Sequence, residues 1–344
     1  MKALKSMNFI TSPYLTQDIS VRRVMLQVLA ALLPGIAVYL WLIGPVILLQ
    51  LAIATVSALL AETAMLKLRD KPLGMFLGDG SAIVTAWLIA LAFPPLAPWW
   101  LVTVGTFFAI IVAKHLYGGL GQNPFNPAMI AFAVCIVSFP SLMSQWPPVE
   151  LKNSLGDQLA LIFGLMPRLD AMSGATPLDA LKTALKLGEG NVSAGTLLDN
   201  REIFGHIAGK GWEWVSLAYL AGGLWLWQRK VIDGHVSAAF IAGIGLIATS
   251  LWLMNPAQFA NPLFHLFSGG TMLGAFFIVT DPVSGCTTPR GKLIFGFSAG
   301  ILAYIIRVFG GYPDGVAFAV LLLNLCAPLI DFYTQPPIFG MKKP

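Results

Sequence analysis

The chain has 344 residues, of which 57% are hydrophobic and only 11% are charged. Soluble domains carry about 25% charged residues, so this composition excludes a soluble globular protein and a disordered one. The mean hydropathy of +0.76 is that of a membrane protein. The net charge of +5 does not indicate a nucleic-acid partner, because the basic residues form small clusters beside apolar runs, which is a signal of membrane topology.

Apolar runs of about 20 residues, the length that crosses a bilayer, alternate with charged residues or with Gly and Pro. They predict an all-α polytopic membrane protein with about ten transmembrane helices. The expected spans are 24–43, 46–66, 81–98, 99–117, 124–143, 212–228, 235–254, 263–280, 292–309 and 313–331. Proline and glycine interrupt several of these runs, so we expect kinked or broken helices inside the protein.

The spans divide the chain into a cytoplasmic N-terminal segment, a first five-helix membrane half, an extracytoplasmic loop, a second five-helix half and a cytoplasmic C-terminal tail. The corresponding ranges are 1–23, 24–143, 144–211, 212–331 and 332–344. With both termini inside, fourteen of the 21 Lys and Arg residues fall on the cytoplasmic side. The positive-inside rule therefore favours this orientation.

A half with five spans contains an odd number of crossings, so any likeness between the halves would be an inverted-topology repeat. Gly78-Asp79-Gly80-Ser81 opens the third span of the first half, and Ser268-Gly269-Gly270-Thr271 lies in the third span of the second. A true 5+5 repeat with broken helices and a chance recurrence of short Gly/Ser patterns both explain this. Paired glycine-rich positions in a repeat would point to a binding site near the membrane midplane.

The long hydrophilic segment 144–211 contains Ser173-Gly174-Ala175-Thr176, followed by Pro177. One interpretation is structural, with Thr176 as the N-cap of a helix and Pro177 as its first residue. Another is chemical, because Ser/Thr-Gly-Ala-Thr is the sequence on which flavin transferases build a threonyl-FMN phosphoester. The two are compatible, since Pro177 favours an extended backbone at Thr176 and a helix N-terminus favours a phosphate charge.

With this motif and four others, the chain resembles the D subunits of Rnf-type ion-translocating ferredoxin:NAD oxidoreductases, and more distantly the B subunits of sodium-translocating NADH:quinone reductases. The other motifs are Ser12-Pro13-Tyr14, Ala31-Leu32-Leu33-Pro34-Gly35, Gly118-Gly119-Leu120-Gly121-Gln122-Asn123-Pro124-Phe125-Asn126-Pro127-Ala128 and Thr280-Asp281-Pro282-Val283-Ser284-Gly285. The resemblance runs from about residue 10 to 335. It departs at Tyr14, where the resemblance leads us to expect His.

The resemblance implies FMN bound covalently at Thr176 and a second, non-covalent flavin such as riboflavin. It implies a multi-pass protein of the bacterial inner membrane, with both termini in the cytoplasm and the flavin-bearing loop in the periplasm. It also implies a complex with other membrane, flavin and iron–sulfur subunits, matured by a flavin transferase. Such a complex would couple electron flow between ferredoxin and NAD to Na+ or H+ translocation.

Four polar residues outside the loop are further candidates for cofactor or ion binding: Asn123, Asn126, Asp79 and Asp281. Asn123 and Asn126 belong either to a tight loop and helix start, or to a broken helix lining a polar cavity that suits a flavin pyrimidine edge or a cation. Asp79 and Asp281 are each either the acid of a turn or N-cap, or a ligand.

Three ionisable residues lie within or at the ends of spans, where a charge is costly. We expect Glu62 to pair with Lys67 or Arg69 at the cytoplasmic boundary, with a role in an ion path as the alternative. We expect Lys114 and Arg307 to extend toward the membrane surface by snorkelling.

Two other classes of protein fit the same broken spans. One is a secondary transporter with an inverted repeat that binds a solute at the membrane midplane. The other is a purely structural assembly protein. A transporter would not require the Ser-Gly-Ala-Thr segment and would be colourless when purified, whereas a structural protein would tolerate changes at Thr176 without loss of electron transfer.

Overall fold

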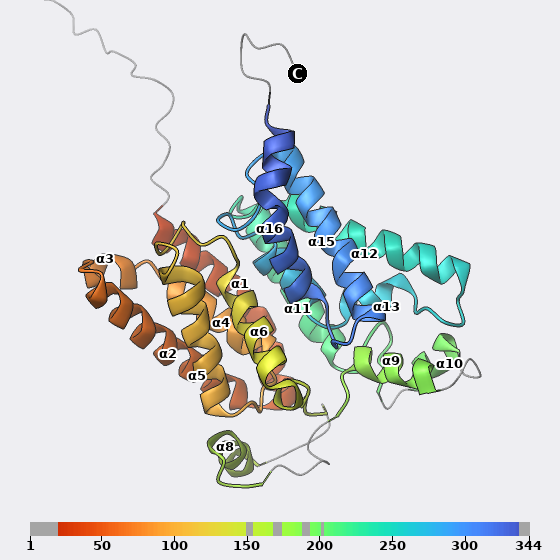
Figure 1. Cartoon of the computed structure of the whole chain (residues 1–344). Helices are drawn as coiled ribbons and strands as arrows, with labels where there is room; N and C mark the ends of the chain where they lie inside the picture. The colour runs from red at the N-terminus through yellow and green to blue at the C-terminus, as the bar shows by residue number, and fades with distance from the viewer. Residues whose placement is uncertain (1–19, 149–153, 168–173, 188–192, 201–202, 337–344) are drawn as a thin grey trace, which may run out of the picture.

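The computed structural model describes residues 20–148, 154–167, 174–187, 193–200 and 203–336. Within these ranges every regular element is a helix, which confirms the predicted all-α fold. The helices form two halves that lie side by side, and the short helices of the connecting segment lie at one end of them (Figure 1).

The first half runs from α1 to α7. Its elements are α1 (Val21–Ile43), α2 (Val46–Leu68), α3 (Leu73–Leu77), α4 (Ser81–Ala92), α5 (Trp99–Phe107), the π-helix η1 (Phe108–His115), α6 (Pro127–Ser138) and α7 (Pro140–Met143). With 12 residues each, α4 and α6 are shorter than the expected spans 81–98 and 124–143. Such a helix is about 18 Å long, well short of the hydrocarbon thickness of about 30 Å.

The chain continues without a helix after α4, and α2 compensates for this break. Gln50 of α2 is 1% exposed. Its Nε2 donates to the carbonyl oxygens of Pro95 (3.1 Å) and Ala97 (2.7 Å). Non-helical backbone at membrane depth is tolerated when protein groups satisfy it in this way.

The second half runs from α11 to α16. Its elements are α11 (Trp212–Gln228), α12 (Gly234–Met254), α13 (Pro262–Phe267), α14 (Thr271–Leu273), the π-helix η3 (Gly274–Ile278), α15 (Pro289–Phe309) and α16 (Val316–Thr334). The expected span 263–280 is broken between α13 and α14, where Gly269 has a φ of +60°. A left-handed backbone of this kind favours glycine.

Among the described residues, five helices are long and apolar enough to cross a membrane by themselves: α1, α2, α12, α15 and α16. The other expected spans correspond to α4, to α5 continued by η1, to α6, to α11, and to α13 continued by α14 and η3. The chain is therefore a multi-pass membrane protein in which long helices accompany short or broken ones.

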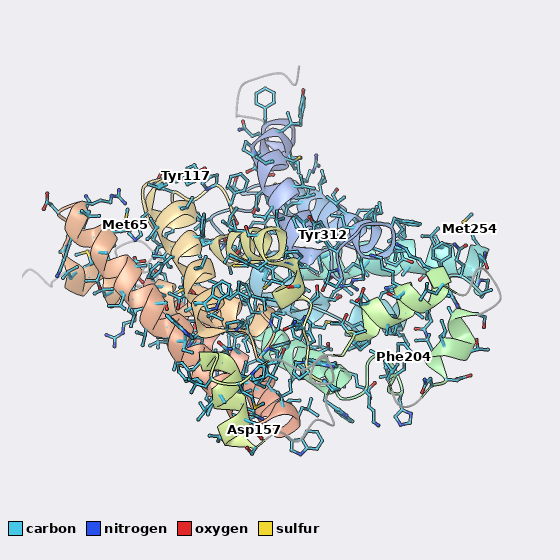
Figure 2. All side chains as sticks on the ribbon, turned by 60° about the horizontal axis from the view of Figure 1, so that its bottom comes forward. Met65, Tyr117, Asp157, Phe204, Met254 and Tyr312 are labelled. Carbon is cyan, nitrogen blue, oxygen red and sulfur yellow. The ribbon has the colours of Figure 1, made fainter. Side chains whose placement is uncertain are left out.

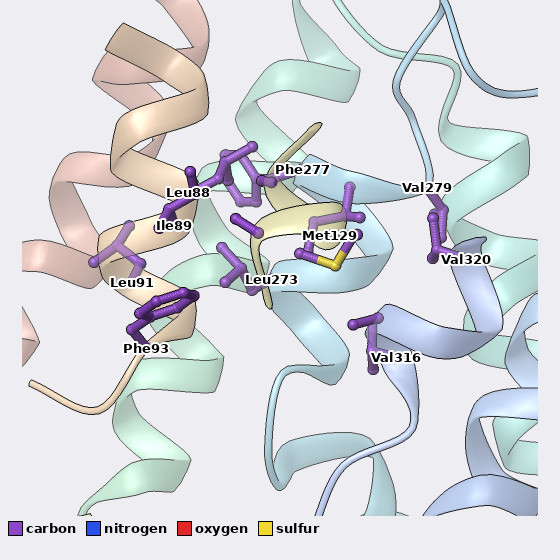
Figure 3. Close-up of a cluster of buried hydrophobic side chains, with 14 of the residues drawn as sticks. Leu88, Ile89, Leu91, Phe93, Met129, Leu273, Phe277, Val279, Val316 and Val320 are labelled. Atoms are coloured by element: carbon purple, nitrogen blue, oxygen red, sulfur yellow. The ribbon is translucent and has the colours of Figure 1, made fainter. Parts of the chain in front are cut away.

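The two halves are joined where α1 packs against α11 and α6 packs against α16. Gly222 allows α11 to approach α1 closely, because a Cβ at this position would collide with the carbonyl oxygen of Ala31. One apolar core extends across both halves. Figure 3 shows part of it, including Leu88 of α4, Met129 of α6 and Phe277 of η3.

The connecting segment contains α8 (Leu155–Phe163), α9 (Pro177–Leu187) and α10 (Ala194–Leu198). These helices lie at the end of the molecule opposite to the start of α1 and the end of α16 (Figure 1). Figure 2 turns this end toward the viewer, with Asp157 marking α8 and Phe204 the chain after α10. The arrangement places the first and last described helix ends on one side and the hydrophilic segment on the other.

Candidate functional site

A cavity of about 130 Å³ lies between the two halves at the end that carries α9. We call it the loop-side cavity. Its lining includes the polar or aromatic side chains of Tyr39, Trp146, Thr176, Trp212, Tyr219 and Ser268. The ring of Trp212 makes edge-to-face contacts with the rings of Tyr39 (centroids 5.4 Å apart) and Trp146 (5.5 Å). The cavity therefore has rigid aromatic walls beside the threonine of the Ser-Gly-Ala-Thr segment.

Thr176 is the N-cap of α9, as the sequence predicts. Its Oγ1 accepts a hydrogen bond from the backbone N–H of Asp179 (3.2 Å), and its carbonyl oxygen accepts one from Ala180 (2.8 Å). Thr176 is half-buried, and Ala175 before it is exposed. The side chain thus lies at the start of a helix and at the wall of a cavity.

The residues before Thr176 are only partly described. Gly174 donates through its backbone N–H to the carbonyl oxygen of Trp146 (2.7 Å), which fixes the segment against the chain that follows α7. Ser173 lies outside the described residues, as does the Ser12-Pro13-Tyr14 motif.

The helix α9 is docked on the second half by apolar and polar contacts. Leu178 and Leu181 are buried against Phe264. The ammonium group of Lys182 donates to the carbonyl oxygens of Gly310 and Tyr312, the latter at 3.2 Å. Burial lowers the pKa of Lys182, and the neighbouring charge of Lys186 acts in the same direction. These contacts hold the helix that begins at Thr176 in a fixed position.

The wall of the loop-side cavity at the break between α13 and α14 is held by an ion pair. Asp314, which lines the cavity, accepts from Arg307 NH2 (2.8 Å) and from the backbone N–H of Gly270 (2.7 Å). Arg307 is 2% exposed and also donates to the carbonyl oxygen of His265 (2.7 Å). The expectation that Arg307 snorkels is therefore wrong, because its guanidinium is buried and engaged in closing the helix break.

A second, larger cavity of about 310 Å³ lies between the halves toward the opposite end. We call it the terminal-side cavity. It is lined by Asn123, Asn126 and Asp281, together with Ser81 and Lys114. The structure thus brings together three of the four polar candidates that lie outside the loop.

The Asn126 side chain connects the halves at this cavity. It is the N-cap of α6, accepting from the N–H of Ala128 (3.1 Å), and its Nδ2 lies 3.5 Å from Asp281 Oδ2. Its backbone N–H donates to the side chain of Asn324 in α16 (3.1 Å). Asn123 is buried and bonds locally, donating to the carbonyl oxygen of Phe125 (3.0 Å). The segment is therefore a tight loop and helix start that also lines a polar cavity.

Asp281 is a turn acid as well as a cavity residue. Its carboxylate accepts from the N–H of Val283 (3.0 Å) and the hydroxyl of Ser284 (2.7 Å). Asn324 donates to the carbonyl oxygen of Ser284 (2.9 Å). Asn324 was not among the residues predicted from the sequence, although an amide within an apolar span is a signal that could have found it.

Asp79 does not join the terminal-side cavity. Its Oδ1 accepts from the backbone N–H of Ser81 (2.7 Å), at the start of α4. It lines a separate shallow depression near α3, together with Arg22 and Met75. The structure therefore places Asp79 as the acid of a turn just before Gly80, the N-cap of α4, and apart from the other candidates.

Glu62 pairs across the first half and not along its own helix. Lys114 Nζ donates to both of its carboxylate oxygens, each at 2.9 Å, and to Ser81 Oγ (3.0 Å). His115 Nε2 lies 3.2 Å from the same carboxylate. The expected pairing of Glu62 with Lys67 or Arg69 is wrong. Snorkelling by Lys114 is also wrong, because its side chain is 3% exposed.

The two halves place their buried cations in matching positions. In the first half Lys114, near the end of η1, bonds to the hydroxyl of Ser81, the first residue of α4. In the second half Arg307, near the end of α15, bonds to the hydroxyl of Thr271 (2.8 Å), the first residue of α14. Each pair joins the third and fourth expected spans of its half, which supports the inverted-topology repeat.

A thin apolar layer separates the two cavities. Leu88 lines the terminal-side cavity and Leu91, one helical turn later, lines the loop-side cavity. Ala128 and Met129 of α6 divide between the cavities in the same way, as do Phe277 and Ile278 of the second half. Leu88, Leu91, Met129 and Phe277 are drawn in Figure 3. The cavities therefore approach each other from opposite ends along the contact between the halves.

The fold and its two cavities define a multi-pass, all-helical membrane protein with polar sites between two halves. Residues 8–340 match the NQR2, RnfD, RnfE family, and the chain belongs to this family. It is 50% identical over 348 residues to the D subunit of the ion-translocating oxidoreductase complex of Escherichia fergusonii, covering 97% of this chain and 98% of that one. It is 51% identical over 334 residues to the protein of the same name from Pseudomonas aeruginosa, covering 97% and 96%. The predicted resemblance to the D subunits of Rnf-type complexes is confirmed.

Proposed function

We propose that this chain is a membrane subunit of an ion-translocating oxidoreductase complex, and that it relays electrons through FMN esterified to Thr176 and through a second, non-covalent flavin. The observation that carries the proposal is the position of Thr176, at a helix N-terminus and in the wall of a cavity between the halves. FMN, when bound, supplies the electron-transfer chemistry, and the protein supplies attachment, orientation and electrostatics.

The surroundings of Thr176 fit a phosphoester. Thr176 is only half-buried and follows the exposed Ala175, which would leave the segment open to a flavin transferase. The backbone N–H of Asp179, in the first turn of α9, donates to Thr176 Oγ1, and a helix N-terminus favours the negative charge that a phosphodiester keeps. The loop-side cavity next to it offers aromatic and hydroxyl groups to part of a flavin ring.

The terminal-side cavity fits the second flavin. Its volume of about 310 Å³ lies at the lower end of the range for small-molecule sites. Asn123 and Asn126 would supply amide donors and acceptors, and Asp281 an acceptor, to the polar edge of riboflavin or a related flavin. The apolar residues of α4 and η3 would cover the remainder of the ring system.

Two carriers at opposite ends suit the distance that electrons must cover. The hydrocarbon core is about 30 Å thick, which is too far for one efficient transfer. In the proposed orientation both termini are in the cytoplasm of a bacterium, and α8, α9 and α10 face the periplasm across the inner membrane. The partners would be the other membrane, flavin and iron–sulfur subunits of an Rnf-type complex linking ferredoxin, NAD and Na+ or H+ translocation.

The test is the intact mass of the denatured chain, expressed with and without a flavin transferase. The expected result is a flavin-sized mass increment that maps to the peptide containing Thr176 and is absent from Thr176→Val. The matched control is Thr196→Val, which removes an exposed threonine of the same hydrophilic segment and should retain the increment. An increment that persists in Thr176→Val, or a fully active native chain without one, refutes the proposal.

The arrangement of two cavities around an apolar layer is also what an alternating-access transporter requires. The purified protein distinguishes the two functions. A colourless preparation that accumulates a solute in vesicles would support transport, whereas a yellow preparation with fluorescence that survives denaturing electrophoresis supports the flavin carrier.

A further inference from the structure

Two residues that line the loop-side cavity carry buried hydroxyl groups without a hydrogen-bond partner among the described residues. These groups are the phenol of Tyr219 in α11 and the side-chain hydroxyl of Ser268, between α13 and α14. Tyr219 is 4% exposed and Ser268 is 1% exposed. Buried polar groups are rarely left unpaired, so each of these hydroxyls calls for a partner.

Another serine in the same cavity does not share this feature. The hydroxyl of Ser216 donates to the carbonyl oxygen of Phe267 (2.9 Å) and is therefore satisfied by the protein. The unpaired groups at Tyr219 and Ser268 are thus specific positions, and not a general property of the cavity.

Both hydroxyls are held rigidly. The ring of Tyr219 lies against Gly35 of α1, where any Cβ would collide with it. It also makes an edge-to-face contact with the ring of Phe277, with the ring centroids 6.0 Å apart. The carbonyl group of Ser268 accepts from Thr271 Oγ1 (3.0 Å), and the following backbone is fixed by Asp314. Donors carried by groups that are fixed in this way lose little conformational freedom when a ligand arrives.

The remaining lining identifies the kind of ligand. Leu91, Phe132 and Ile278 are apolar, and the rings of Trp146 and Trp212 stand edge to face. A flat heteroaromatic molecule with carbonyl groups on one edge satisfies both the apolar walls and the two hydroxyls. A cavity of about 130 Å³ could hold only one end of a flavin ring, and in the proposed function that flavin would be attached at Thr176, which lines the cavity.

We propose that Tyr219 and Ser268 hydrogen-bond the pyrimidine edge of the flavin carried by Thr176, and that they raise its reduction potential. The inference rests on the proposed function of Thr176. A bound flavin that accepted two electrons from a reductant and one proton from the solvent would carry negative charge at N1 and the C2 carbonyl, and Tyr219 and Ser268 would donate to this edge. Hydroxyl donors aimed at this edge stabilise the reduced form more than the oxidised form.

The experiment is a redox titration with dithionite of the full chain, purified after co-expression with a flavin transferase. The absorbance of Thr176→Val is subtracted to isolate the tethered flavin. We expect Tyr219→Phe and Ser268→Ala to keep the covalent mass increment. Each should lower the ratio of reduced to oxidised flavin about tenfold at a fixed potential, which is a shift of about 30 mV to more negative values.

Two matched controls remove buried unpaired hydroxyls elsewhere. Tyr304→Phe and Ser237→Ala make the same chemical changes at residues that line neither cavity, and they should leave the potential unchanged. Ser268→Thr keeps a hydroxyl at this position, so its flavin should have a reduction potential close to that of the unmodified chain. If Tyr219→Phe does not accumulate in the membrane, Ser268→Ala and Ser268→Thr decide the question.

The two ways of failing are distinguishable. Covalent flavin with an unshifted potential in both Tyr219→Phe and Ser268→Ala overturns the assignment of these residues and leaves the proposed function intact. A chain that carries no flavin on Thr176 overturns the proposed function itself.

Discussion

Replacement of Lys114 by Met tests the buried ion pair in the first half. Lys114 Nζ makes three contacts, two with Glu62 and one with Ser81. Methionine keeps most of the apolar stem but leaves a carboxylate that is 2% exposed without its cation. Removing one partner of a buried pair costs about 3–5 kcal/mol. His115 remains 3.2 Å from the carboxylate, so we expect a loss near the lower end, about 3 kcal/mol.

The assay is a double-mutant cycle on the free energy of unfolding, measured by denaturant titration in detergent micelles. Lys114→Met and Glu62→Gln should each lower the free energy of unfolding. The loss in the double variant should be clearly smaller than the sum of the two single losses, because neither member of the ion pair is left buried alone. Lys67→Met is the control: Lys67 is exposed on the same helix as Glu62, and its loss should change stability by about 0.5 kcal/mol at most. Additive losses, or an effect of Lys114→Met no larger than that of Lys67→Met, would refute the pairing.

Two further predictions concern the contact between the halves and the docking of α9. In Gly222→Val the new side chain collides with the carbonyl oxygen of Ala31, so the free energy of unfolding should fall by about 3 kcal/mol or more in a thermal-unfolding assay. The control is Gly245→Val on α12, where a Cβ meets no atom within 4 Å. Its free energy of unfolding should change by about 1 kcal/mol at most in the same assay. Burial, and next the charge of Lys186, hold the pKa of Lys182 below its ordinary value of about 10.4. At pH values just below about 10.4 the unfolded chain therefore binds more protons than the folded chain. The free energy of unfolding should rise as the pH increases through this range. Lys182→Met should flatten this rise in unfolding midpoints measured from about pH 8 to 10, and an equal rise in the variant would contradict the assignment.

Local patterns in the sequence predicted the long helices well and the broken ones poorly. The bounds of α11 coincide with the expected span 212–228, because its apolar run is continuous. The expected span 81–98 was too long because apolar residues continue past Ala92 to Ala97, although Pro94-Pro95 interrupts the run and indicates a break. What permits the chain to leave the helix there is Gln50, a long-range partner that no local pattern reveals.

The same distinction between local and distant contacts applies to the candidate sites. The N-cap at Thr176 was predictable because the capping bond joins residues three apart. Glu62 was assigned the wrong partner because neighbours in sequence were preferred, whereas packing of η1 against α2 brings Lys114 to it from 52 residues away. The approach of Asn126 to Asp281, across 155 residues, depends on how the halves meet and has no sequence signal.

The apolar layer between the cavities bears on what can cross this chain. Leu88 and Leu91 line different cavities but are three residues apart, which is about 4.5 Å along a helix axis. An ion passing between the cavities would have to lose its water among leucine, methionine and phenylalanine side chains, and burial of an unpaired charge is very costly. An electron needs no such solvation. In the proposed function this contact between the halves is therefore a short gap for electrons and a barrier to ions. The buried cations Lys114 and Arg307 stabilise it from either half, because they bond to the first residues of α4 and α14.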